Sequence, residues 1–239
     1  MGCASLTTSL AGTRLILRAD RTAFLPDTAT LLLADIHLGK AQSLRSLGAP
    51  LSAGLQTALL DEPLARWAEA IRDTRAARVI VLGDLLHAPV GLTAALIDHV
   101  AAWRRGITCP ISVVPGNHDR RLEHVAGAWE MAITDACIEY AGLLLTHDPA
   151  DTDALQRAHA ARLPLVGGHV HPALNLPAGC GPSRAPVFAF GAASLTLPAF
   201  TTFAAGAPIN PASYERLVAI AGDELVPLAA PPRRTPSAP

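Results

Sequence analysis

The chain has few aromatic residues, few cysteines and no long apolar run, and each shortage excludes a class of protein. Aromatic residues make up 4% of the 239 positions, and no interleaving of basic and aromatic residues offers a platform on which bases would stack. The four cysteines are scattered without CxxC spacing, which argues against a structural zinc site or a disulfide framework. No apolar run approaches the ~18–20 residues of a membrane span.

Charge is also in short supply. Charged residues make up 16% of the chain and the formal net charge is −1, so any affinity for nucleic acid must come from a local basic patch. The N-terminal stretch MGCASLTTSLAGTR lacks a basic segment followed by an apolar block, and Leu6 stands where a myristoylation site needs Ser or Thr. We therefore expect a cytoplasmic protein with no membrane partner.

What the chain does have is apolar content, at 50% of its residues. This length and content suit one large core, and we expect a single domain over residues 1–229 followed by a disordered, Pro-rich tail over 230–239. Trp67, Trp103 and Trp129 are expected to pack in that core.

Short apolar runs alternate with longer amphipathic segments. Buried strands are predicted at 14–18, 30–34, 78–82, 111–114, 163–166, 187–190 and 194–197, and helices at 54–75 and 92–103. Two hairpins are predicted, one joining 133–140 to 143–146 and one joining 217–221 to 224–228. Strands that alternate with helices indicate an α/β fold with a partly parallel sheet.

Polar side chains gather at the ends of five of these strands. They are Asp35 and His37, Asp84, Asn117 and His118, His147, and His169 and His171. Sites in open α/β sheets form beyond the carboxyl ends of strands, so loops far apart in sequence can converge there. Gly83, Gly116 and Gly168 flank three of these ends and allow the backbone to turn close to a bound ion.

The donor types indicate metal binding. Without His118, the set offers three oxygen donors and four imidazoles, a mixture that suits Mn, Fe, Zn or Ni better than the all-oxygen cages of Ca or Mg. Seven donors are too many for one tetrahedral ion and suit two ions that share a carboxylate, an arrangement used to hydrolyse phosphate esters. Each element taken singly has a simpler reading: GNHD can cap a helix, and a lone histidine is usually a core residue.

Taken in order, the elements resemble those of the calcineurin-like metallophosphoesterases, whose signature is D-x-H, G-D, G-N-H-D/E, H and G-H-x-H. The chain reads ADIH, LGD, PGNHD, LTH and GGHVH between Ala34 and His171. The resemblance implies a four-layer α/β/β/α sandwich that holds two divalent metal ions, with manganese the first expectation.

The resemblance also assigns roles. One metal would be bound by Asp35, His37, Asp84 and His171. The other would be bound by Asp84, Asn117, His147 and His169, with Asp84 bridging. His118 would contact the substrate and protonate or stabilise the leaving oxygen, and Asp119 would hold the His118 imidazole.

A narrower resemblance is to the bacterial metallophosphoesterases grouped with a ligase-associated DNA-damage-response system. The runs LLLADIHLGKAQSLRSLGAPL, VLGDLLHA, VPGNHDRR and GHVHPA carry it, including a short helix and a Gly-x-Pro turn after ADIHLGK. It implies a DNA endonuclease or phosphodiesterase that works with a DNA ligase and a helicase. One departure is LPAFTTFAAG, where the subfamily tends to have LPAFGxFTGG.

Several residues near the motifs are candidate contacts for substrate phosphates or the substrate path. They are Lys40, Arg45, His87, Arg120 and Arg121; the alternative for each is an ordinary solvated or capping position. Two alternative functions also stand beside the nucleic-acid phosphodiesterase. One is a pyrophosphatase or phosphodiesterase for a small nucleotide or nucleotide-linked lipid, and the other is a non-catalytic, metal-bound repair scaffold, which would not need His118.

Overall fold

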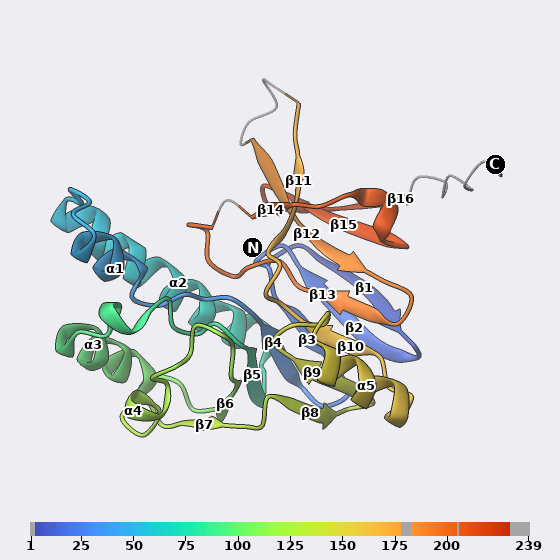
Figure 1. Ribbon diagram of the computed structural model, residues 1–239, viewed down its shortest axis with the longest axis horizontal. Helices are drawn as coiled ribbons and strands as arrows, with labels where there is room; N and C mark the ends of the chain where they lie inside the picture. The colour runs from blue at the N-terminus through green and yellow to red at the C-terminus, as the bar shows by residue number, and fades with distance from the viewer. Residues whose placement is uncertain (1–2, 178–182, 205, 230–239) are drawn as a thin grey trace.

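The computed structural model describes residues 3–177, 183–204 and 206–229, and it contains two β-sheets packed face to face (Figure 1). The first sheet has the order β1-β2-β3-β4-β5-β6-β7. Its strands are β1 Ser5–Leu10, β2 Thr13–Arg18, β3 Ala23–Leu25, β4 Thr30–Leu33, β5 Arg78–Leu82, β6 Ile111–Val114 and β7 Met131–Ile133. From β4 to β7 neighbouring strands run parallel, so their carboxyl ends meet at one edge.

The second sheet follows the path β14-β11-β12-β13-β10-β9-β8, with β15 paired to β12 and to β16. Its strands are β8 Cys137–Tyr140, β9 Leu143–Thr146, β10 Leu165–Gly167, β11 Pro172–Asn175, β12 Arg184–Phe190, β13 Ser194–Thr196, β14 Ala207–Pro208, β15 Arg216–Ala221 and β16 Glu224–Ala229. Strands β9, β10 and β13 are parallel, which gives this sheet a second set of aligned carboxyl ends.

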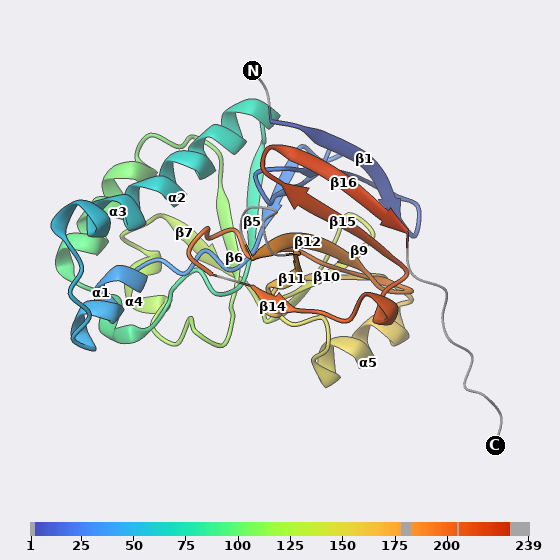
Figure 2. The same ribbon diagram turned by 90° about the horizontal axis from the view of Figure 1, so that it is seen from above.

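Helices cover the outer faces of both sheets (Figure 2). They are α2 Ala53–Thr74, α3 Ala94–Arg104 and α4 Glu123–Ala126 on the first sheet and α5 Thr152–Ala161 on the second, whereas α1 Lys40–Ser46 packs against α2. Helices α2 and α3 pack on the first sheet through a core that contains Trp67 and Trp129, both fully buried, with Trp103 packed against it. Helix α5 packs on the second sheet through Ala154 and Ala158.

Leucine, valine and phenylalanine side chains fill the space between the sheets. Leu32, Leu82 and Val114 of the first sheet belong to the same buried cluster as Leu145 and Phe188 of the second. The layers are therefore helix, sheet, sheet and helix, which confirms the predicted four-layer α/β/β/α sandwich. The predicted tail at 230–239 lies outside the described residues.

One predicted hairpin differs from the structure. Residues 137–140 do pair with β9, but Ile133 belongs to β7, which pairs with β6 in the other sheet. The intervening residues carry the chain from one sheet to the other, so the apolar run that predicted one strand is divided between two sheets. None of the described helices is long and apolar enough to cross a membrane.

Candidate metal centre

The residues predicted to bind metal lie together where the carboxyl ends of the two sheets meet. Asp35 and His37 follow β4, Asp84 follows β5, and Asn117 follows β6 in the first sheet; His147 follows β9, and His169 and His171 follow β10 in the second. Parallel pairing within each sheet brings each group to one edge, and the packing of the sheets brings the edges together.

Four of these residues form a first group. Single donor atoms of Asp35, His37, Asp84 and His171 all lie within 4.8 Å of one another. The Nε2 atoms of His37 and His171 are 3.2 Å apart, and His171 Nε2 is 3.4 Å from Asp35 Oδ1. The four donors therefore surround one small space that is largely shielded from solvent.

A second group forms on the other side of Asp84. It contains Asp84, His147 and His169, whose donor atoms meet the same 4.8 Å limit. Asn117 belongs with them, because its Oδ1 is 3.0 Å from His147 Nε2, which is in turn 3.0 Å from His169 Nδ1. The Asp84 carboxylate is shared, with Oδ1 3.5 Å from His147 and Oδ2 3.9 Å from His37.

The arrangement of protons in the second group fits a cation. His147 Nδ1 lies 3.1 Å from the Leu82 carbonyl oxygen, which can only accept, so Nδ1 carries the proton and Nε2 presents a lone pair. That lone pair faces both the Asn117 oxygen and His169 Nδ1, each at 3.0 Å, and one bound cation would account for this grouping of donor atoms. Ligands bound to one ion at about 2.1 Å and at right angles lie about 3 Å apart, which matches these spacings.

Burial also favours cation binding by the first group, because it keeps the imidazole of His37 neutral. It lowers the pKa of His37 to about 2, with the nearby His171, His87, His118 and Lys40 adding to the effect. His37 is therefore neutral at physiological pH, and only neutral imidazole binds metal. The side chain of Asp35 is fully buried and that of Asp84 nearly so, and buried carboxylates are retained where a cation or hydrogen-bond donors compensate them.

The backbone at these residues is strained. Five of the seven predicted ligands, Asp35, His37, Asp84, His169 and His171, have positive φ values between 49° and 68°. Non-glycine residues in this region cost of order 1 kcal/mol each, and such residues cluster at functional sites. The glycines between them serve close approach: a Cβ on Gly116 would overlap Asp84, and a Cβ on Gly168 would overlap Asp35.

Replacing Gly116 by alanine is expected to lower the free energy of unfolding by about 1–3 kcal/mol, because the new methyl group would push the Asp84 backbone and carboxylate aside. Gly127→Ala is the matched control, since it has open space and a helical φ of −65°. Urea unfolding of the two metal-free variants measures the difference. Equal stability of the two variants would show that the close approach at Gly116 is unimportant.

The structure corrects the role expected of Asp119. Its Oδ1 accepts from the Leu86 amide and its Oδ2 from the Gly116 amide, both at 2.9 Å, so it joins the two loops rather than holding an imidazole. The imidazole of His118 is held instead by the backbone carbonyl of His87, which accepts from Nδ1 at 2.7 Å. The free nitrogen, Nε2, lies 3.9 Å from Asp84 Oδ2 and faces the site.

The predicted substrate contacts fall into different settings. His87 packs against His37 and stacks on His118, and exposed Arg120 lines a small hollow with Asn117 and His118. Lys40 donates to the Phe203 carbonyl at 2.7 Å, whereas exposed Arg45 donates to Gln56 on α2. Arg121 is exposed. His87 and Arg120 therefore lie beside the predicted leaving-group residue, His118.

One carboxylate beside the site was missed by the sequence argument. Asp148 Oδ2 lies 3.8 Å from His169 Nε2, on the side of the ring opposite the Nδ1 atom that faces His147. A carboxylate in this position favours the tautomer that presents Nδ1 to a metal. The available signal was its place directly after His147 in LTHD.

Comparisons with known proteins agree with this geometry. The crystal structure of Pseudomonas putida nuclease MPE aligns with 94% of this chain and 100% of its own, at a TM-score of 0.77 and 28% sequence identity. The chain has a metallophosphoesterase-like fold. A protein of unknown function from Aquifex aeolicus, AQ665, aligns with 59% of this chain and 78% of its own at 18% identity, but its TM-score of 0.43 is too low to indicate a shared fold. No protein-family model and no curated protein matches the chain.

The metallophosphoesterase-like fold and the buried groups of Asp and His residues together support a metal-dependent hydrolase. The fold places loops from both sheets around Asp84, and the residues on those loops are the types that bind divalent ions. The buried groups can hold metal ions.

Proposed function

We propose that the protein is a phosphodiesterase that uses two divalent metal ions, manganese first among Mn, Fe, Zn and Ni, to hydrolyse phosphodiester bonds in nucleic acid. The observation that carries the proposal is the pair of donor groups that share the Asp84 carboxylate. Two ions held about 3.5–4 Å apart by a bridging carboxylate are the arrangement used for in-line displacement at phosphorus.

The substrate class rests on similarity to a solved nuclease over 94% of the chain. The narrower resemblance to ligase-associated metallophosphoesterases supports DNA as the nucleic acid and a role in DNA repair beside a ligase and a helicase. A cytoplasmic location is proposed with it. In its most specific form, the proposal is that the protein is a DNA endonuclease.

The chain's own residues divide into two sets of ligands. Asp35, His37, Asp84 and His171 would hold one ion, and Asp84, Asn117, His147 and His169 would hold the other. Bound there, the ions would supply a nucleophilic water and neutralise the charge that spreads over the phosphoryl oxygens. The Leu82 carbonyl fixes the His147 tautomer, and the amide of His169 donates to both carboxylate oxygens of Asp35.

His118 is proposed as the proton donor to the leaving oxygen. Its Nδ1 proton is engaged by the His87 carbonyl, so Nε2 is the atom left to donate. Its side chain is 42% exposed, whereas Asp84 beneath it is 3% exposed, which places the imidazole between the donor groups and the solvent from which a substrate arrives. Arg120 lines the hollow beside it and would contact a neighbouring phosphate.

A substrate panel tests the proposal directly. Purified protein stripped with a chelator and reloaded with Mn should cleave single- or double-stranded DNA, and adding the chelator again should abolish cleavage. RNA, cyclic nucleotides and nucleotide diphosphate lipids complete the panel. Cleavage confined to the nucleotide diphosphates would replace the proposal with the pyrophosphatase alternative, and a metal-loaded protein inactive on every substrate would favour the scaffold.

A further inference from the structure

A short segment between β13 and β14 lies against the metal centre. We refer to residues 199–203 as the strap. Its Phe200 amide donates to the Ala34 carbonyl at 2.8 Å, and its Thr201 amide donates to the Asp35 carbonyl at 3.3 Å. Phe200 and Thr201 are both buried, as is Asp35. The position of the strap therefore helps to fix the backbone from which the Asp35 carboxylate projects.

Two arginines hold the strap by its own carbonyl oxygens. Arg21, in the turn between β2 and β3, donates through Nη1 to Ala199 at 3.2 Å and to Thr201 at 2.5 Å. Arg66, on α2, donates to the carbonyl of Phe200 and places its guanidinium 4.1 Å from the centre of the Phe200 ring. Three successive carbonyls are thus held by two guanidinium groups.

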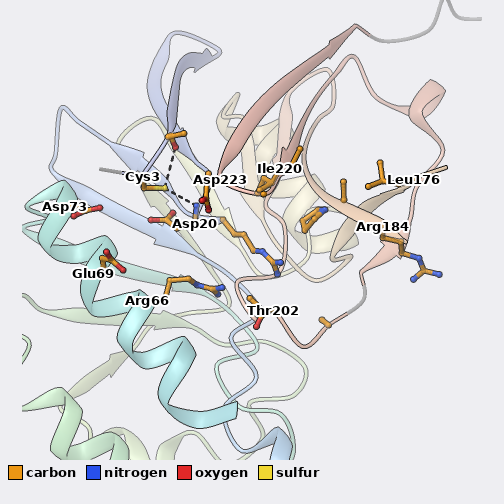
Figure 3. Close-up of a pocket in the computed structure, with 18 of the residues that line it drawn as sticks. Cys3, Asp20, Arg66, Glu69, Asp73, Leu176, Arg184, Thr202, Ile220 and Asp223 are labelled. Atoms are coloured by element: carbon orange, nitrogen blue, oxygen red, sulfur yellow. Dashed lines mark hydrogen bonds between the residues drawn. The ribbon is translucent and has the colours of Figure 1, made fainter. Parts of the chain in front are cut away.

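Packing and hydrogen bonds both hold the strap. The side chain of Phe200 is fully buried in the core of the first sheet. A hollow of about 1050 Å³ lies beside the strap, and Thr202 and Arg66 line it (Figure 3), as does Arg21. At this hollow the carbonyl oxygens of the strap accept hydrogen bonds from the guanidinium groups of Arg21 and Arg66.

Arg21 is an unfavourable residue to keep in this place for stability alone. Its backbone has a φ of 71°, and no ion pair within the described part of the chain includes it. Burial, and to a lesser degree the neighbouring Arg66, lowers its pKa to about 10, opposed by Glu62. Arg21 is partly buried, and within the described residues its side chain donates hydrogen bonds to carbonyl oxygens. A partly buried cation on a strained backbone has a cost that a purely structural residue of another type would avoid.

We propose that Arg21 and Arg66 are positioning residues of the metal centre, which hold the strap so that its amides fix the Asp35 segment in the geometry that binds metal. The proposal rests on the proposed function only in that Asp35 binds a metal ion. It concerns metal affinity and makes no claim about the substrate. The strap belongs to the LPAFTTFAAG segment. Of the three residues whose carbonyls the arginines bind, Ala199 and Phe200 match the related pattern LPAFGxFTGG and Thr201 departs from it.

The test is Mn binding by Arg21→Ala and Arg66→Ala, measured by titration calorimetry in the absence of substrate. Loss of residues that orient metal ligands typically weakens binding about 10–100-fold, and we expect that range for each variant. Because the cavity opens beside the deleted side chain, low millimolar guanidinium ion should restore much of the affinity of Arg21→Ala. A residue that only stabilises the fold would give neither result.

Arg104→Ala is the matched control. Arg104 is a buried arginine that likewise donates to backbone carbonyls, those of Ile107 and Glu130, and neither carbonyl lies next to a proposed ligand. Its loss should leave Mn affinity unchanged, and equal weakening in Arg104→Ala would overturn the proposal, as would wild-type affinity in Arg21→Ala or a failure of guanidinium to restore it.

If Arg21→Ala shows no cooperative unfolding transition, the comparison of Arg66→Ala with Arg104→Ala decides the question by the same criterion. Failure of this proposal is distinct from failure of the proposed function. A wild-type protein that binds Mn but cleaves no phosphodiester leaves the positioning role intact. If the protein is a nuclease but Arg21→Ala and Arg66→Ala bind Mn with wild-type affinity, only the positioning role is refuted.

Discussion

Asp84→Asn is expected to lower kcat/KM for a phosphodiester by about 10³-fold or more, or about 4 kcal/mol of transition-state stabilisation. The change keeps the shape of the side chain and an oxygen that can accept from the His118 amide. It removes the negative charge and one of the two oxygens that face the two donor groups. The protein should then bind fewer than two Mn ions at concentrations that saturate the wild type.

The same variant should unfold at a higher urea concentration than the wild type when both are free of metal. Asp84 and Asp35 are buried carboxylates whose oxygens lie within 4.8 Å of each other, and like charges this close destabilise the fold unless a cation lies between them. A gain in stability with a loss of activity identifies a residue kept for function.

The control is Asp27→Asn, which removes an exposed carboxylate paired with Arg14 on the surface. It should leave activity unchanged and stability within about 0.5 kcal/mol. An Asp84→Asn protein that retained activity within tenfold of the wild type would refute a bridging role for Asp84.

His118→Ala is expected to lower kcat by about 10²–10⁴-fold on DNA, the usual contribution of a general acid. The loss should be much smaller on a p-nitrophenyl phosphodiester, because nitrophenolate leaves without a proton. Mn affinity should be unchanged, since Nδ1 is engaged by the His87 carbonyl and Nε2 belongs to neither donor group. Steady-state kinetics on the two substrates, with calorimetry for Mn, provide the measurement.

His124→Ala is the matched control for that experiment. His124 lies six residues further along the chain, is exposed, and contacts Glu123 rather than the site. Its removal should alter neither substrate's kinetics. Equal losses on DNA and on the nitrophenyl ester in His118→Ala would mean that His118 binds the substrate or shapes the site and does not protonate the leaving oxygen.

The sequence could predict that the ligands lie close together because each follows an apolar strand. Their residue types, Asp, Asn and His, indicated metal binding. Asp35, Asp84 and His147 each stand directly beyond a run that reads as a buried strand, and parallel pairing then dictates where they meet. The alternation of strands and helices predicted an α/β fold with a partly parallel sheet, whereas the four-layer arrangement was implied by the resemblance to the metallophosphoesterases. The assignment of the ligands to two particular ions remains a prediction.

The features of the site that could not be predicted from the sequence depend on backbone contacts between distant segments. The family resemblance implied that Asp119 holds His118, but the turn directs its oxygens to the amides of Leu86 and Gly116. Arg21 carried no signal, because its partners are carbonyl oxygens, which every residue has. Helix α5 was missed for another reason: Ala154 and Ala158 form its buried face and make a weak apolar pattern.

The most direct test of the account is anomalous diffraction from crystals of the protein soaked in Mn. Two peaks are expected, one among Asp35, His37, Asp84 and His171 and one among Asp84, Asn117, His147 and His169. They should lie about 3.5–4 Å apart with the Asp84 carboxylate between them. A single peak, or Mn bound away from Asp84 at saturating concentration, would contradict the two-metal account.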